Sequence, residues 1–296
     1  MNVWITFTVF AALMQAVRTA GQKQLTSSVS PMAATLVRYV FGLPFAIAYL
    51  LFLERYDAVT HLSNAIQIPR FVTYALLAGV AQILATFLLV KAVSFKNFTV
   101  GTSFAKTEAI QTAVFGMLLF GSTLNALGWL AVAVGVAGIF IVSIPTKNGR
   151  WEPMNILLGT LSGTAFSFTS LWLREASISL GLPVLTSAAV TLLFMVTTQS
   201  LMCMTYIALK EPEQFSAMMK RIRLCWFVGL TSALGSIGWF TAMTAQNPAL
   251  VKSLGQVEFI FTLLITTLFF KEKVTGRELF GVLAIVASVI LIIKAT

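Results

Sequence analysis

The chain has 296 residues, of which 58% are hydrophobic and 10% are charged, and its mean hydropathy is +0.89. Water-soluble domains carry about 25% charged residues, so this composition excludes a soluble protein and predicts a polytopic membrane protein. A formal net charge of +10 would indicate nucleic acid binding in a soluble protein. In a membrane protein, lysine and arginine collect in the loops beside one membrane face, so we expect a lipid bilayer and no nucleic acid as the partner.

A helix needs roughly 20 mostly apolar residues to cross the hydrocarbon core of a bilayer. Apolar runs between polar breaks predict ten such helices, and the connections are too short for an extramembrane domain. In chain order the predicted spans are 3–21, 31–53, 70–91, 97–120, 124–145, 155–174, 183–209, 225–246, 249–270 and 277–294. The first run lacks a basic leader and a small-residue cleavage site, so we expect it to remain as the first span.

Few residues here are suited to metal binding or covalent catalysis. Cys203 and Cys225 lie in or beside apolar segments and form no disulfide or metal-binding pattern. His61 and Asp57 share one polar loop, and no G-x-S-x-G motif occurs. A membrane-embedded enzyme needs a nucleophile with a base, paired acids or a metal site. The sequence therefore predicts no enzyme, no metal and no cofactor.

The two halves of the chain repeat each other. At a constant offset of 150 residues the matching pairs are Ala92 and Ala242, Asn97 and Asn247, Ser103 and Ser253, Glu108 and Glu258, and Thr112 and Thr262. Earlier in each half, Arg18 matches Arg174 and Pro31 matches Pro183. A unit with an odd number of spans must place its second copy upside down, an arrangement common in secondary transporters. We predict an all-α membrane protein of ten transmembrane helices in two inverted five-helix repeats, 1–146 and 147–296.

Small residues form one stripe on the last span of each half. The stripes consist of Gly128, Ala131 and Gly135 in the first half and Gly281, Ala284 and Ser288 in the second. Small side chains let helix backbones approach closely in lipid, where packing drives helix association. These stripes therefore predict helix contacts and no chemistry.

The predicted spans contain charged residues that include Arg38, Lys106, Glu108, Lys252 and Glu258. A charge near the centre of a membrane helix costs about 2.5–3.5 kcal/mol on insertion scales, so such residues normally face the protein interior or a watery cavity. Two structural alternatives remain open. Lys252 can extend to the membrane interface, and Arg38 can make a structural contact beside Pro31.

Helical spacing gives each half one acidic face and one face of lysine with hydroxyl or amide groups. The acidic faces carry Glu108 and Glu258, and the other faces carry Thr102, Ser103 and Lys106 in the first half and Lys252, Ser253 and Gln256 in the second. We predict that the second set, together with Arg38, binds substrate. Glu108 and Glu258 are predicted to bind protons or a cationic group, because occupancy removes a buried charge. Two acids and two bases suit a zwitterion, but each glutamate can instead simply hold neighbouring spans together.

A resemblance to one family covers nearly the whole chain. It is carried by three stretches, "SPMAATLVRYVFGLPF", "LLFGSTLNALGWLAVAVGVAGIFIVS" and "LFFKEKVTGRELFGVLAIVASVILII". They are similar to the EamA-type branch of the drug/metabolite transporter superfamily. The resemblance implies a central cavity lined by the first four helices of each half. Relatives commonly export amino acids, metabolites or toxic compounds, and some relatives import their substrates. Many relatives carry proline where this chain has Glu108 and Glu258, so the resemblance does not transfer a substrate.

The sequence as a whole predicts a multi-pass protein of the bacterial inner membrane, acting as a monomer or homodimer. We expect a secondary active transporter that moves a small polar or amphipathic metabolite, amino-acid-like or similar, by alternating access. Export coupled to protons is the expected mode. A multidrug or toxic-compound efflux carrier, a passive channel and a structural membrane protein are the alternatives.

Overall fold

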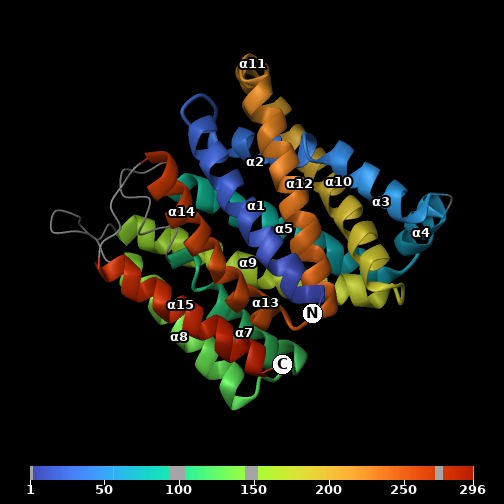
Figure 1. Cartoon of the computed structure of the whole chain (residues 1–296). Helices are drawn as coiled ribbons and strands as arrows, with labels where there is room; N and C mark the ends of the chain where they lie inside the picture. Colours follow the sequence, from blue (N-terminus) through green and yellow to red (C-terminus); the bar gives the residue numbers. More distant parts are fainter. Residues whose placement is uncertain (1–2, 56, 94–103, 144–152, 271–275, 296) are drawn as a thin grey trace.

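The computed structural model describes residues 3–55, 57–93, 104–143, 153–270 and 276–295, and every regular element within them is a helix (Figure 1). The α-helices are α1 (Val3–Leu25), α2 (Pro31–Val40), α3 (Leu43–Glu54), α4 (Ala58–Ile66), α5 (Pro69–Val93), α7 (Glu108–Phe120), α8 (Ala126–Ser143), α9 (Pro153–Ser179), α10 (Val184–Lys210), α11 (Glu213–Lys220), α12 (Ile222–Ala245), α13 (Pro248–Leu254), α14 (Glu258–Phe270) and α15 (Gly276–Ala295). A 3-10 turn, η1 (Gly255–Val257), joins α13 to α14. The all-α prediction is confirmed for the described part of the chain.

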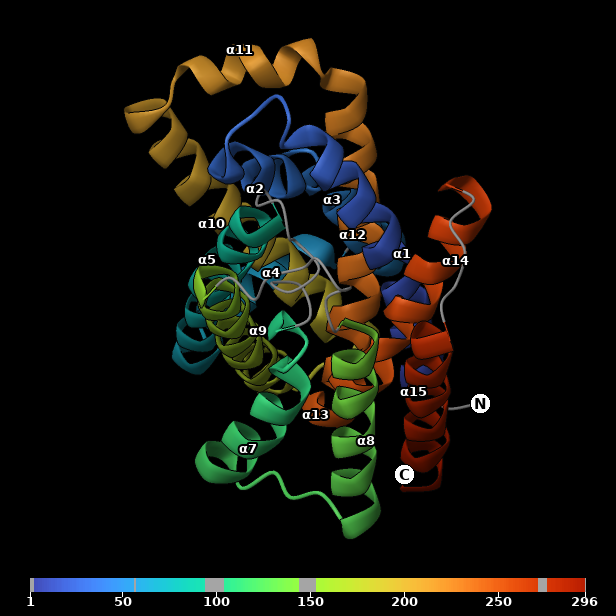
Figure 2. The ribbon, with the colours of Figure 1, turned by 90° about the vertical axis from the view of Figure 1, so that its left-hand side faces the viewer.

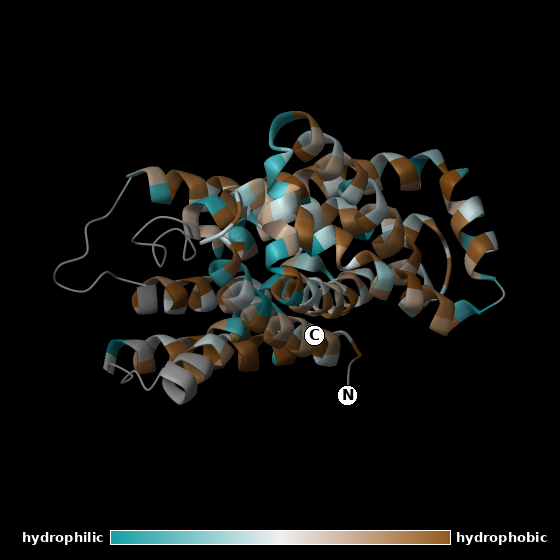
Figure 3. Cartoon of the chain, turned by 90° about the horizontal axis from the view of Figure 1, so that it is seen from above, coloured by the Kyte–Doolittle hydropathy of each residue, from teal (hydrophilic) through white to brown (hydrophobic). Residues whose placement is uncertain are grey.

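Six described segments are long and apolar enough to cross a membrane. They are Val3–Leu25, Pro31–Glu54, Pro69–Ala92, Pro153–Ser179, Val184–Lys210 and Ile222–Ala245. Three shorter apolar helices, Glu108–Phe120, Ala126–Ile141 and Leu279–Ala295, fall in other predicted spans. Hydrophobic residues dominate most helices when the molecule is coloured by hydropathy (Figure 3).

Two connections that we predicted as loops contain short helices. The first holds α4, whose residues Ala58 and Ala65 are buried. The second holds α11, which lies across one end of the helices α10 and α12 (Figure 2). The Ser30 amide, at the start of α2, donates to Gln214 Oε1 of α11 at 2.8 Å. α11 therefore covers one end of the long helices, and α4 packs against α3, α5 and α10.

The long helices pack in pairs that join the two halves of the chain. α1 packs along α12, α5 along α9, and α8 along α15. The last pair runs side by side in both views (Figures 1 and 2). The small-residue stripes meet here, because Ser288 Oγ donates to the Ala131 carbonyl at 2.7 Å and a Cβ at Gly138 would lie 2.9 Å from the Gly281 carbonyl oxygen. The sequence predicted that each stripe makes a close helix contact, and the structure shows that the two stripe-bearing helices contact each other.

The second predicted span bends between α2 and α3. Pro44 has no amide hydrogen for the preceding turn, so the helical hydrogen bonding is interrupted there. On the facing helix, a Cβ at Gly229 would lie 2.4 Å from the Phe41 Cβ. Gly229 therefore lets α12 approach the bend directly.

The fourth and ninth predicted spans are not continuous helices, and for the described residues that prediction was wrong. In the fourth, Lys106 and Thr107 form a turn and α7 begins at Glu108, while 97–103 lie outside the described residues. In the ninth, η1 interrupts the helix and α14 begins at Glu258. Tertiary packing accompanies both breaks: Gly163 of α9 lies against the first and Trp239 of α12 against the second.

Glycine makes both of these approaches possible. A Cβ at Gly163 would lie 2.9 Å from the Ala105 carbonyl oxygen and 3.3 Å from the Glu108 amide nitrogen. A Cβ at Gly255 would lie 2.3 Å from the Trp239 ring. The breaks place a glutamate at the first residue of each following helix, where the helix dipole favours negative charge.

Candidate functional site

The two helix breaks bring four charged side chains together as two ion pairs, and each pair joins one half of the chain to the other. Lys252 Nζ lies 3.3 Å from Glu108 Oε2. Lys106 Nζ pairs with Glu258 Oε2 in the same way. Glu108, Glu258 and Lys252 are each less than 9% exposed. The structure thus collects these predicted site residues at the interface of the halves.

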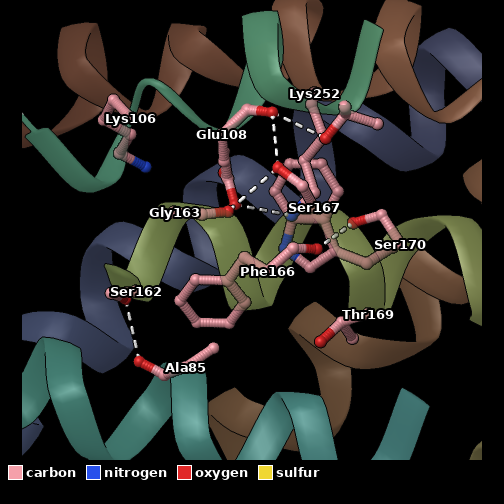
Figure 4. Close-up of polar contacts among 12 residues, drawn as sticks. Ala85, Lys106, Glu108, Ser162, Gly163, Phe166, Ser167, Thr169, Ser170 and Lys252 are labelled. Carbon is pink, nitrogen blue, oxygen red and sulfur yellow. Dashed lines mark hydrogen bonds and ion pairs between the residues drawn. The ribbon is translucent and has the colours of Figure 1, made fainter. Parts of the chain in front are cut away.

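The two glutamates are held alike. Thr112, one turn after Glu108, donates its hydroxyl to the Glu108 carbonyl at 2.6 Å. Thr262 does the same for the Glu258 carbonyl at 2.9 Å. Ser167 of α9 also donates to the Glu108 carbonyl, at 3.0 Å (Figure 4). The side-chain carboxylates are thereby left to face the lysines.

Gln15 of α1 and Trp239 of α12 link the two ion pairs. Gln15 Nε2 donates to Glu258 Oε2 at 2.7 Å, and Trp239 Nε1 donates to Gln15 Oε1 at 2.9 Å. Lys252 Nζ lies 4.8 Å from the centroid of the Trp239 ring and 5.5 Å from that of Phe166, distances at which aromatic rings attract a cation. One chain of polar and cation–π contacts therefore runs from Lys106 to Glu108.

A cavity of about 120 Å³ lies on one side of this chain, and we call it the acidic cavity. Its charged lining residues are Lys106, Glu108 and Glu258. Apolar walls are supplied by residues that include Phe166 and Phe259. Convergent polar groups in a mostly apolar pocket are typical of a small-molecule site.

A second cavity, of about 30 Å³, lies on the other side, and we call it the basic cavity. Its charged lining residues are Arg18, Arg38 and Lys252. Gln15 and Phe166 line both cavities, so the two spaces are neighbours separated by a thin wall.

The remaining predicted site residues are placed differently from one another. Arg38 lines the basic cavity and donates Nη1 to Thr86 Oγ1 at 2.9 Å. Ser253 and Gln256 are buried but line neither cavity, and the Gln256 amide points at Gly135 of α8. Their roles as substrate ligands stay predictions. Thr102 and Ser103 lie outside the described residues.

Three residues at the site were not predicted as site residues. Gln15 and Arg18 lie in the first apolar run, where a polar and a charged residue within a span are a usable signal. Trp239 gives no such signal, because tryptophan is common at the ends and packed faces of membrane helices. Its role depends on which residues it contacts.

A multi-pass helical protein with broken helices and buried ion pairs between its halves has the features of a secondary transporter. The amino-acid sequence assigns it further. Residues 2–144 match the model of the EamA-like transporter family, which is part of the drug/metabolite transporter superfamily. The sequence-based prediction of the family is confirmed, and the chain is an integral, multi-pass membrane transporter.

Solved structures support the fold independently. One crystal structure superposes with a TM-score of 0.74 over 99% of this chain and 96% of its own, at 15% sequence identity. At that identity the likeness shows the fold alone. No curated protein matches the chain.

Proposed function

We propose that the protein is a secondary active transporter that moves a small polar or amphipathic metabolite, amino-acid-like or similar, by alternating access. We further propose export across the bacterial inner membrane, coupled to protons, by a monomer or homodimer. The observation that carries this proposal is the placement of two acid–base pairs, exchanged between the halves of the chain, at helix breaks beside a buried cavity.

Helix packing supports the inverted repeat on which the proposal rests. If the halves are equivalent, α1 corresponds to α9 and α5 corresponds to α12 by their order in each half. Under this equivalence, the observed pair of α1 with α12 corresponds to the observed pair of α9 with α5. α8 and α15 are equivalent to each other and also pack together. Both glutamates begin a helix after a break at matching positions.

The ion pairs offer a mechanism for alternating access. Each pair bridges the halves, so both pairs favour one relative arrangement of the two repeats. A proton on either carboxylate removes the attraction within the pair. A cationic group of the cargo competes with that proton for the same carboxylate, which is sufficient to couple their movements in opposite directions.

A ligand screen followed by flux measurements tests the proposal. The purified chain is melted in the presence of amino acids, amines, sugars and nucleotides, because a ligand that binds the native state raises the melting temperature. The strongest stabiliser, radiolabelled, is then the probe in proteoliposomes with an imposed pH gradient. Glu258→Gln and Glu108→Gln are expected to remain folded at the assay temperature and to lose pH-driven flux.

Glu175→Gln is the matched control, because Glu175 pairs with Arg70 at the exposed end of α9 and lies outside both cavities. It is expected to retain pH-driven flux. Coupling that persists in both site variants would remove the role proposed for the glutamates. Flux without counterflow of internal cargo would instead indicate a passive channel.

A multidrug or toxic-compound carrier is the second candidate. The acidic cavity favours a carrier of this kind, because it has apolar walls beside two carboxylates. The apolar residues are Leu89, Ile139, Phe166 and Phe259. Such a surface suits an amphipathic cation. Hydrophobic cations added to the same screen distinguish the candidates, because stabilisation by them, and not by polar metabolites, would favour drug efflux.

A further inference from the structure

The buried charges around the two cavities do not balance. Two carboxylates, Glu108 and Glu258, face four cations: Lys106, Lys252, Arg18 and Arg38. Each carboxylate already pairs with a lysine. Within the described part of the chain, neither arginine has an ion pair with a carboxylate. Two positive charges therefore remain without a counter-charge where little water reaches them, and buried charges are costly unless they are paired.

Arg18 shows most clearly that a partner is needed. It is 3% exposed, and its Nε is buried with no hydrogen-bond acceptor among the described residues. Arg174, which matches Arg18 in the sequence repeat, donates Nη1 to the carbonyls of Met243, Thr244 and Gln246 at 2.6–3.2 Å. Arg174 therefore satisfies the last carbonyls of α12, whereas Arg18 lines a cavity.

The basic cavity also limits the size of any ligand. Its volume is about 30 Å³, and one water molecule needs roughly 10–15 Å³ by the same kind of measure. The space suits a single carboxylate group or a monovalent anion of similar size. Guanidinium groups are well matched to it, because their planar donors bind carboxylates with two parallel hydrogen bonds.

We propose that the basic cavity is an anion subsite in which Arg18, Arg38 and Lys252 bind one carboxylate group or one small monovalent anion. The bound anion supplies the missing counter-charge and the acceptor that Arg18 Nε lacks. Lys252 lines this cavity and contacts Glu108 in the other, so an anion competes with Glu108 for the same ammonium.

This competition connects the subsite to transport, a step that rests on the proposed function. An anion that draws Lys252 away leaves the Glu108 carboxylate without its partner, free to bind a proton or a cationic group. The carboxylate of the cargo would then open Glu108 to the cationic group of the same cargo, which displaces the proton. A free anion would instead act as an activator that the cargo does not displace.

Equilibrium binding to the purified full chain in detergent tests the subsite without any transport. Sodium acetate and sodium chloride are titrated separately into a buffer whose only other anion is a bulky sulfonate, at constant ionic strength, and the melting temperature is recorded. We expect a saturable rise with acetate. Arg18→Gln and Arg38→Gln should weaken the apparent affinity about tenfold or more, because each removes charge-assisted hydrogen bonds.

Two further variants and one further measurement make the test selective. Arg70→Gln, at an exposed arginine, should leave the response unchanged. Arg18→Lys keeps the charge and should bind more weakly than the wild type while staying folded. In anion-free buffer, Arg18→Gln should melt above the wild type, since it removes an uncompensated buried charge.

The outcomes decide both the subsite and its occupant. A tighter response to acetate than to chloride supports a carboxylate of the cargo, whereas an equal or tighter response to chloride assigns the site to a free ion and overturns the cargo role. No saturable response, or one that Arg18→Gln and Arg38→Gln leave intact, overturns the subsite itself. Loss of pH-driven flux in Glu258→Gln is a separate result, so the two proposals fail independently.

Discussion

The two neighbouring cavities differ in how the protein balances their charge. In the acidic cavity the carboxylates of Glu108 and Glu258 each have a lysine partner from the other half of the chain. In the basic cavity Arg18 and Arg38 have no carboxylate partner among the described residues. The wall between them is shared, because Gln15 and Phe166 line both.

This difference separates two uses of a buried charge. Where the protein supplies the counter-charge, the pair is part of the structure, and breaking it changes how the halves fit together. Where the protein supplies none, the charge is stable only with a partner from outside. Lys252 takes part in both, since it contacts Glu108 and lines the basic cavity.

The largest expected effect comes from breaking a balanced pair. Glu108→Gln leaves Lys252 without its buried partner and should lower the free energy of unfolding by about 3–5 kcal/mol. Unfolding of the purified protein in mixed micelles with increasing SDS measures this. The double variant Glu108→Gln with Lys252→Gln should recover most of the loss. A neutral single variant would mean that the pair is not structural.

A smaller loss of stability should follow from overpacking the second helix break, where Trp239 lines the basic cavity. Gly255→Ala places a Cβ 2.3 Å from the Trp239 ring, which lies against the Lys252 ammonium. Overpacking of this kind costs about 1–3 kcal/mol, and it should also shift the fluorescence of the protein because the ring moves. Gly276→Ala is the control, because a Cβ there meets nothing within 4 Å. Equal stability of the two variants would contradict the close packing at the break.

Removing the polar link between the cavities should cost somewhat less. Gln15→Leu deletes the hydrogen bonds to Glu258 and from Trp239, so we expect a loss of about 1–2 kcal/mol. Thermal melting in detergent is the measurement. Gln24→Leu, at an exposed position on the same helix, is the matched substitution and should have little effect. If both variants melt alike, Gln15 does not connect the two sites.

The smallest effect is expected for a charge pair at the surface. Arg70 is 61% exposed and pairs with Glu175 at 2.6 Å. Arg70→Gln should change stability by about 1 kcal/mol or less, because water screens the pair on the side of the exposed arginine, although Glu175 is only 15% exposed. Thermal melting in detergent, as for Gln15→Leu, measures this change in stability. A loss as large as that of Glu108→Gln would show that burial does not set the scale of these effects.

The sequence predicted much of the architecture, because hydropathy records which segments can lie in lipid. Most predicted spans correspond to described helices, and the small-residue stripes that end each half lie at close helix contacts, as expected. Glu108 and Glu258 were recognisable as residues that need polar partners, since a short charged side chain inside a span needs a polar environment, and the structure pairs each of them with a lysine.

The helix breaks were not predictable from hydropathy. The stretches around Lys106 and Gly255 mix apolar residues with charged and polar ones, and hydropathy alone does not distinguish a break there from a continuous span that carries buried charges. They break where Gly163 and Trp239, from helices distant in the sequence, lie against the backbone. Such contacts depend on the packing of helices and leave no periodic signal.

Arg18 and Arg174 show the same limit for the charged residues. Both are arginines at matching positions of the repeat, and the sequence treats them alike. Only the fold places the end of α12 within reach of Arg174 and leaves Arg18 beside a cavity.

The sequence by itself determined that this protein lies in a membrane and which charged residues must be sheltered there, and it predicts a repeat. These properties follow from the free energy of moving each side chain out of water, which is local to the residue. Only the tertiary structure decided which acid meets which base and which arginines remain without a partner. Pairing requires two groups to lie within a few ångströms of each other, and that distance is set by the packing of all the helices together.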